Sequence, residues 1–390
     1  MSERTEMRTR SALATPLLAL GIAAGLHAAT TGALAEPRAL AEAVAAWLAT
    51  LDVDQRDEAT YAFTDDERFD LRLAPIGLEG LRRGAMNEAQ WGAWRAALAA
   101  ALSESGLHKV ETIMSLEREV RRRDSERFLG GFFGGFVHGE ERYFASVYGA
   151  PAEGAPFGLR FDGHHLSLNW TVPREGRLSV TPLFLGAEPR EVPAGWERAG
   201  LRALAAEEDA GVALWRALDA GQREVAELPF SFARGIAGGD RALFLGEGAR
   251  VEPPEPQGIA RAALDPAQAA LLDALIDTYL ASFDAAIAAE RRAVIDAAGR
   301  EKIHFAWSGN LEPGHAGYYR VQGPTFLIEF DNTLEEADHV HAVLREWEGD
   351  FGRDLLAEHY AREHTQQVRA APLGPRPLVG SGDESSRLAR

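Results

Sequence analysis

The spacing of apolar residues alternates between two periods along this chain, and this alternation constrains the fold more than any other feature. Helical spacing is found over residues 38–49, 87–105, 110–124, 199–219 and 265–299. Extended spacing is found over residues 143–148, 158–172, 177–185, 302–308, 317–322, 325–330 and 339–347. The pattern predicts an α+β fold, in which an antiparallel sheet is built from a central hairpin region and a C-terminal meander, with segregated helices. No internal repeat is evident.

The ends of the chain differ in character from its middle. Arg8 and Arg10 precede a small apolar stretch over residues 12–29, and Ala33-Leu34-Ala35 resembles a cleavage site. We expect residues 1–35 to be a signal peptide, with the protein secreted or periplasmic and not bound to a membrane after cleavage. A membrane anchor is the alternative. Residues 36–370 are expected to form a single domain, and the polar residues 371–390 a disordered tail.

Composition excludes several classes of site. The formal charge is -18, so the clustered positive charge that nucleic acid binding requires is not expected here. The chain contains no cysteine, which removes disulfides, thiolate nucleophiles and cysteine metal ligands. Any metal ion must therefore be held by histidine, carboxylate or main-chain oxygen.

Six of the eleven histidines fall between residues 304 and 364. In an extended His339-Val340-His341 segment both imidazoles point to one face, roughly 7 Å apart at the backbone. On the preceding strand Glu329 and Asp331 alternate with apolar residues, so the carboxylates share a face. The pattern predicts a transition-metal site, with zinc as the default ion and copper or iron as alternatives. The other interpretation is a solvated face.

Further histidines extend the candidate ligand set. His164 and His165 are adjacent, so on a strand they point to opposite faces and at most one easily joins a common site. His304 opens a strand of the C-terminal block, and His359 lies on a helix expected over residues 352–364. The proposed metal ligands are thus His339, His341, His164, His165, His304, Asp331 and His359. Each histidine could instead have a structural role.

Four charged residues of the C-terminal block are candidates for catalysis. Glu329 and Asp350 could serve as a base, and Arg320 and Arg345 could hold an anionic substrate group. The alternative for both arginines is a structural ion pair with a neighbouring carboxylate.

Several longer motifs together indicate a family. They are Thr112-Ile113-Met114-Ser115-Leu116-Glu117, Gly163-His164-His165-Leu166-Ser167-Leu168-Asn169, the run from Tyr318 to Thr333, and Asp350-Phe351-Gly352-Arg353 with His359-Tyr360. In these motifs the chain resembles the domain-of-unknown-function family 3500, a group of uncharacterised secreted bacterial and fungal proteins. The resemblance spans residues 52–360 and implies export without naming an activity.

These observations lead to one functional expectation and two alternatives. We expect an exported metal-dependent enzyme, a hydrolase acting on a small or anionic substrate, because motifs for other hydrolases and for nucleotide binding are missing. The first alternative is an exported protein that binds a small ligand without turnover. The second is a structural envelope protein whose histidines are all satisfied within the fold. The sequence does not indicate the oligomeric state.

Overall fold

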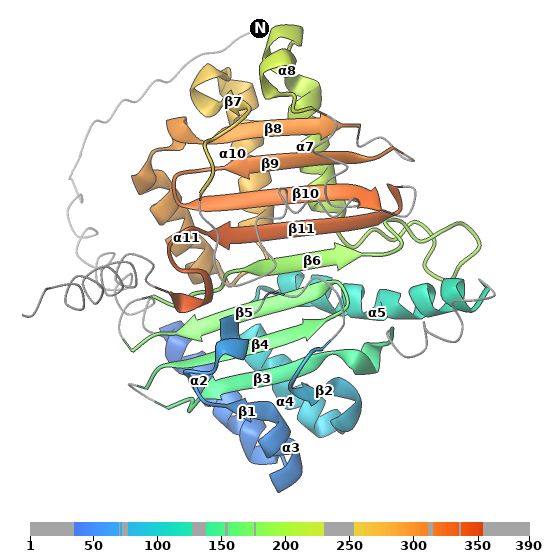
Figure 1. The fold of residues 1–390 in the computed structure, drawn as a ribbon, viewed down its shortest axis with the longest axis vertical. Coiled ribbons are helices and arrows are strands. Elements are labelled where there is room, and N and C mark those ends of the chain that lie inside the picture. The colour runs from blue at the N-terminus through green and yellow to red at the C-terminus, as the bar shows by residue number, and fades with distance from the viewer. Residues whose placement is uncertain are drawn as a thin grey trace, which may run out of the picture.

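The computed structural model describes residues 35–69, 71, 77–126, 138–152, 155–174, 177–229, 253–310, 315–334 and 337–353. Its centre is one eleven-stranded sheet with the order β1–β3–β4–β5–β6–β11–β10–β9–β8–β7, and β2 also pairs with β3 (Figure 1). The strands are β1 (Thr60–Tyr61), β2 (Leu81–Arg82), β3 (Phe144–Gly149), β4 (Phe157–Gly163), β5 (Leu166–Val172), β6 (Leu183–Ala187), β7 (Ile259–Ala260), β8 (His304–Gly309), β9 (Gly317–Gln322), β10 (Phe326–Leu334) and β11 (His339–Glu346). Named strands pair antiparallel except β1 with β3.

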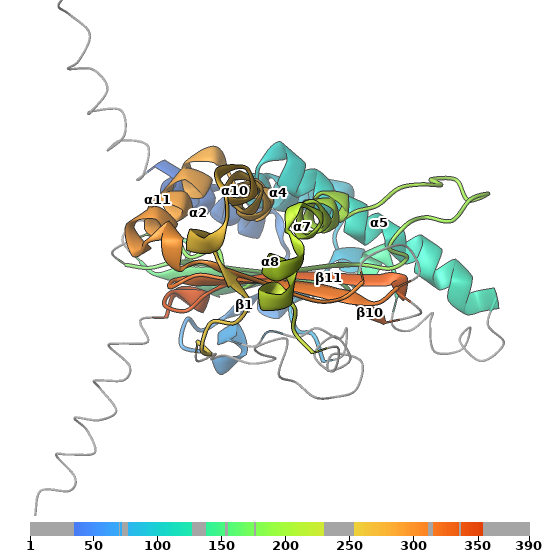
Figure 2. The same cartoon turned by 90° about the horizontal axis from the view of Figure 1, so that it is seen from above.

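Most of the helices cover one face of this sheet (Figure 2). They are α2 (Ala35–Thr50), α3 (Val53–Ala59), α4 (Glu88–Ala99), α5 (Glu104–Glu126), α7 (Ala205–Ala217), α8 (Ala220–Ala226), α10 (Pro266–Leu280) and α11 (Ala285–Ala298). The predicted α+β class is confirmed. Within the described ranges, no helix combines the length and the apolar character that crossing a membrane requires.

The two faces of the sheet carry different side chains. On β10, Phe326, Ile328 and Phe330 join the hydrophobic core under the helices. The alternate residues Glu329 and Asp331 project to the opposite face, and both are nonetheless fully buried. The strand alternation seen in the sequence therefore correctly separates an apolar core face from a polar face.

Several predicted elements are wrong in detail. The segment 158–172 is not one strand but the hairpin of β4 and β5, which turns at His164 and His165. The long helix expected over residues 265–299 is broken between α10 and α11, where Leu102 and Phe283 form an isolated antiparallel bridge. Expectations for residues 1–34, 354–364 and 371–390 lie outside the described residues.

The expectation of no internal repeat is also wrong, because two halves of the chain build the same motif. Strands β3, β4, β5 and β6 form one antiparallel meander, and β8, β9, β10 and β11 form another. The edges correspond as well. Leu81 pairs with Ala145 as Ile259 pairs with Phe305, and the parallel contact of β1 with β3 recurs as a bridge from Glu227 to Trp307.

Equivalent residues of the two halves meet in the middle, which defines a pseudo-two-fold axis. Leu168 pairs with Leu183 on β6, and its counterpart Ile328 pairs with Leu344 on β11. Leu183 and Leu344 then pair with each other. Above the sheet, Ser103 N donates to Ser282 O (3.1 Å) and Asp284 N donates to Ala101 O (2.9 Å), a symmetric pair of bonds before α5 and α11.

Two glutamine pairs repeat the same helix-capping arrangement in each half. Gln90 accepts from the N-cap nitrogen of Asn87 (2.9 Å) and donates to Gln55 Oε1 (2.7 Å). Gln268 accepts from Asp265 N (3.0 Å) and donates to Gln222 Oε1 (2.7 Å). Each buried amide therefore ties the start of α4 or α10 to the preceding short helix.

Replacing Gln90 or Gln268 with alanine is expected to lower the free energy of unfolding by about 2 kcal/mol in each case. Each substitution removes a capping bond and leaves the partner glutamine short of one bond. Because the two sites lie in different halves and share no partner, the double variant should show the sum of both losses. Denaturant unfolding measures this, and unequal or non-additive losses would argue against equivalent roles.

Candidate functional site

The turn between β4 and β5 presents two histidines at one point. Gly163 pairs with Leu166, so His164 and His165 form a two-residue turn. His165 has φ 63°, a left-handed conformation that few side chains adopt. The expectation that the two rings point to opposite faces is wrong, because turn residues do not alternate as strand residues do. Their rings stack with centroids 3.7 Å apart.

The second part of the site comes from the seam between the two halves. His339 opens β11, and Glu188 follows the last residue of β6. The pairing of His341 with Gly186 places these strand ends next to the β4–β5 turn. Gly186 is required for this approach, because a Cβ atom there would lie 2.8 Å from the His165 ring and 3.0 Å from the His341 ring.

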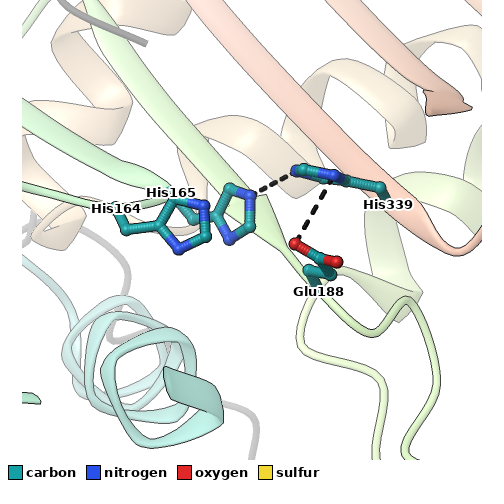
Figure 3. Close-up of side chains that lie close together, drawn as sticks. All are labelled: His164, His165, Glu188 and His339. Atoms are coloured by element: carbon teal, nitrogen blue, oxygen red, sulfur yellow. Dashed lines mark hydrogen bonds and ion pairs between the residues drawn. The ribbon is translucent and has the colours of Figure 1, made fainter. Parts of the chain in front are cut away.

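Four side chains converge at this point (Figure 3). His164, His165, Glu188 and His339 each place a possible ligand atom within 4.8 Å of the other three. Nε2 of His165 and Nε2 of His339 are in direct contact, and their ring centroids are 4.5 Å apart. The ring of His341 lies next to that of His339, and their centroids are 4.6 Å apart. The described residues thus contain a buried group that could hold a metal ion.

Three of these histidines contact a carboxylate through Nδ1. The distances are 2.8 Å from His164 to Glu117 Oε1, 3.6 Å from His339 to Glu188 Oε2 and 3.3 Å from His341 to Asp331 Oδ2. The contact between His164 and Glu117 has hydrogen-bond geometry, and a proton on that Nδ1 leaves the lone pair on Nε2. Carboxylates commonly orient metal-binding histidines in this way.

The surroundings of His165 and Glu117 set their charge states. Burial first, and then the neighbouring histidines, hold the pKa of His165 well below its usual value, so this imidazole is neutral and can bind a metal. Burial alone would raise the pKa of Glu117, but hydrogen bonds from His138 and His164 outweigh it and lower that pKa to about 2. Glu117 is therefore a buried anion.

A second group adjoins the first and shares His164 with it. It consists of Glu117 on α5, His138 and His164. His138 Nδ1 lies 3.1 Å from His164 Nδ1 and 3.5 Å from Glu117 Oε2. Five histidines and three carboxylates therefore form one continuous cluster on the side of the sheet where β5, β6 and β11 meet.

Among the residues expected from sequence, several lie elsewhere. His304 is on β8, where its Nδ1 contacts Lys302 O (2.9 Å), and three strand positions separate it from β11. Arg320 is paired with Glu329 (3.2 Å), and Arg345 with Asp350 (2.6 Å), both as buried ion pairs. His359 lies outside the described residues.

Sequence reasoning missed three members of the cluster. Glu117 lies on a helix, His138 follows it by 21 positions, and Glu188 comes directly after β6. His138 belongs to none of the sequence motifs, yet its side chain is only 15% exposed. The one available signal was the Thr112–Glu117 motif, which the family resemblance singled out without assigning Glu117 a role.

Comparison with known proteins agrees with the motifs. Over residues 35–353 the sequence matches the family described as protein of unknown function (DUF3500). No curated protein and no solved structure matches the chain. The matched region begins at the first residue of α2 and ends with the last described residue, so it contains both halves of the fold and every member of the cluster. The chain therefore belongs to the DUF3500 family.

Proposed function

We propose that this protein is an exported, metal-dependent hydrolase whose centre is the group of His164, His165, Glu188 and His339. The observation that carries the proposal is the direct contact between the Nε2 atoms of His165 and His339. A ring protonated at Nδ1 carries a lone pair on Nε2, so both of these nitrogens can bind one cation. Histidine and carboxylate donors without cysteine suit zinc first, and copper or iron as alternatives.

The chemistry follows from the donor set. A bound divalent ion supplies Lewis acidity, which lowers the pKa of a water molecule and polarises a substrate oxygen. Three histidines leave Glu188 as a fourth ligand or as the base that takes the proton from the attacking water. Asp331 Oδ2 lies 3.3 Å from Nδ1 of His341, whose ring is beside the centre. The side chains of His164 and His339 are 10% and 13% exposed, so a small substrate fits the site best.

Export is proposed on separate grounds. The family match begins at residue 35, next to the cleavage site that Ala33-Leu34-Ala35 resembles. Mass spectrometry of protein recovered from the periplasm or medium should therefore find an N-terminus at Glu36. Full-length protein retained in the cell would contradict export.

Metal analysis tests the central proposal. Purified protein is expected to retain at least one zinc-sized ion per chain, and EDTA should lower its melting temperature, because the ion binds only the folded state. Zinc, copper and iron are then returned singly, and hydrolysis of small ester and phosphate substrates is measured. The proposal would be overturned if the purified protein contains no metal and its melting temperature does not change with EDTA or with added ions. Metal without turnover would favour the binding protein instead.

A further inference from the structure

We propose that Glu117, His138 and His164 form a second metal site, which shares His164 with the first and makes the centre dinuclear. The inference rests on the proposed function, since it adds an ion to the same cluster. Its geometric basis is the mutual closeness of three donor atoms from three separate segments. They come from α5, from the segment before the 3-10 helix Glu140–Arg142, and from the β4–β5 turn.

The separations match those around a small divalent ion. His164 Nδ1 lies 2.8 Å from Glu117 Oε1 and 3.1 Å from His138 Nδ1, and His138 Nδ1 lies 3.5 Å from the other carboxylate oxygen, Oε2. Ligand atoms bound tetrahedrally to zinc at 2.0–2.2 Å lie about 3.4 Å from one another. The donors therefore need to move only by tenths of an ångström to hold an ion.

Hydrogen bonds alone explain these contacts less well. If both Nδ1 atoms donate to the Glu117 carboxylate, no hydrogen bond joins the two nitrogens, although they lie 3.1 Å apart. If one nitrogen instead donates to the other, the accepting Nδ1 has no proton to give to Glu117. Glu117 alone would suffice to orient His164, so the approach of His138 indicates a further role.

The position of His138 is built into the fold. Arg121 on α5 donates to the carbonyl oxygen of His138 and also to Glu141 (2.7 Å). The next residue, Gly139, donates its backbone N–H to Glu117 Oε2 (2.9 Å). These bonds fix the backbone on both sides of the imidazole. Glu117 is 1% exposed, and a buried carboxylate is stabilised by a nearby cation.

The second half of the chain provides an internal comparison. Its β9–β10 turn has Pro324 and Thr325 where the first half has His164 and His165. The residue before Gly299, which N-caps a 3-10 helix as Gly139 does, is Ala298 and not a histidine. Since the same architecture forms there without these donors, the fold does not require them. This favours a ligand-binding role over a structural one.

Sharing His164 follows from the two nitrogens of its ring. Nδ1 faces Glu117 and His138, while Nε2 remains for the group with His165 and His339. Binding the second ion replaces the Nδ1 proton, which passes to solvent, and the ring then binds one ion on each side. The two sites would be coupled through one imidazole.

Counting ions in matched variants tests the second site. After equilibration with zinc and removal of excess, the native protein should hold two ions, His138→Ala one, His339→Ala one and the double variant none. His304→Ala is the control, a histidine of the same sheet outside the cluster, and should hold two. Glu117→Gln changes the shape of the side chain little and should also hold one ion, as His138→Ala does. Circular dichroism and melting temperature show whether each variant is folded.

The outcomes separate this inference from the proposed function. One ion that is lost in His339→Ala but kept in His138→Ala would overturn the second site and leave the hydrolase centre intact. One ion with the opposite pattern would overturn the first site and keep the second. Native protein that binds no zinc would overturn both.

A magnetic measurement tests the sharing of His164. With two copper(II) ions bound through one imidazole, the paramagnetic resonance signal per copper should be weaker than in His138→Ala, where one ion remains. Two independent signals that simply add would show that the ions do not share a ligand.

Discussion

Replacing His165 or His339 with alanine is expected to weaken zinc binding by about 10²-fold and to reduce hydrolysis to the level of the metal-free protein. Structural zinc sites bind with roughly 10–16 kcal/mol from four ligands, so one ligand contributes about 3 kcal/mol. Competition with a coloured chelator measures the affinity. The hydrolytic rate is measured at one fixed zinc concentration that saturates the native protein but not the variants.

The same experiment includes its own comparisons. His304→Ala should keep native affinity, because His304 is hydrogen-bonded at β8 and lies apart from the cluster. Asp331→Asn should leave zinc affinity nearer the native value, since Asp331 contacts His341, which lies beside the first group and is not a member of it. If His304→Ala loses the metal while His339→Ala keeps it, the centre lies elsewhere on the sheet.

The sequence predicts the second half of the fold better than the first, and the reason is turn chemistry. Gly323-Pro324 is a recognisable turn sequence between β9 and β10. The sequence accordingly predicts two separate strands there, over residues 317–322 and 325–330. Between β4 and β5 the residue that adopts the left-handed conformation is His165, where glycine or asparagine is usual. Without such a signal, the alternating apolar residues on either side suggest one uninterrupted strand.

The internal duplication escapes sequence inspection for a related reason. Some equivalent positions of the two halves carry the same residue, as in the pairs Gln55 and Gln222, or Gly163 and Gly323. These residues make the helix-capping contacts and the hairpin turns. Core positions need only apolar volume, so Leu168 corresponds to Ile328 without resemblance at the level of letters. Helix lengths also differ, since α4 has 12 residues and α10 has 15.

The candidate site is predictable where its members share strands and hidden where they do not. Period-two alternation places His341 and Asp331 on one face, and the structure pairs them directly across β10 and β11. Glu117 and Glu188 reach the cluster only through the packing of α5 and the joining of β6 to β11. Those contacts depend on topology, which no local pattern encodes.

The buried pair of Arg345 and Asp350 gives the second large expected effect. Arg345→Met should lower the free energy of unfolding by about 3–5 kcal/mol, because it leaves the Asp350 carboxylate buried without this partner. Asp350 also accepts from the backbone N–H of Glu346 (2.9 Å), so its carboxylate ties the end of β11 to the following 3-10 helix, Asp350–Gly352. Equilibrium unfolding in urea measures the loss.

A double-mutant cycle distinguishes an ion pair from a catalytic role. Asp350→Asn keeps an oxygen for the Glu346 N–H, and combining it with Arg345→Met should recover about 2 kcal/mol, since no unpaired charge then remains buried. The paired geometry at 2.6 Å, with Arg345 only 2% exposed, favours this result. If Arg345→Met unfolds at the same urea concentration as the native protein but no longer hydrolyses substrate, Arg345 would instead bind an anionic substrate group, as the sequence pattern suggested. Recovery in the double variant would assign the pair to holding β11, and with it His339 and His341, in register.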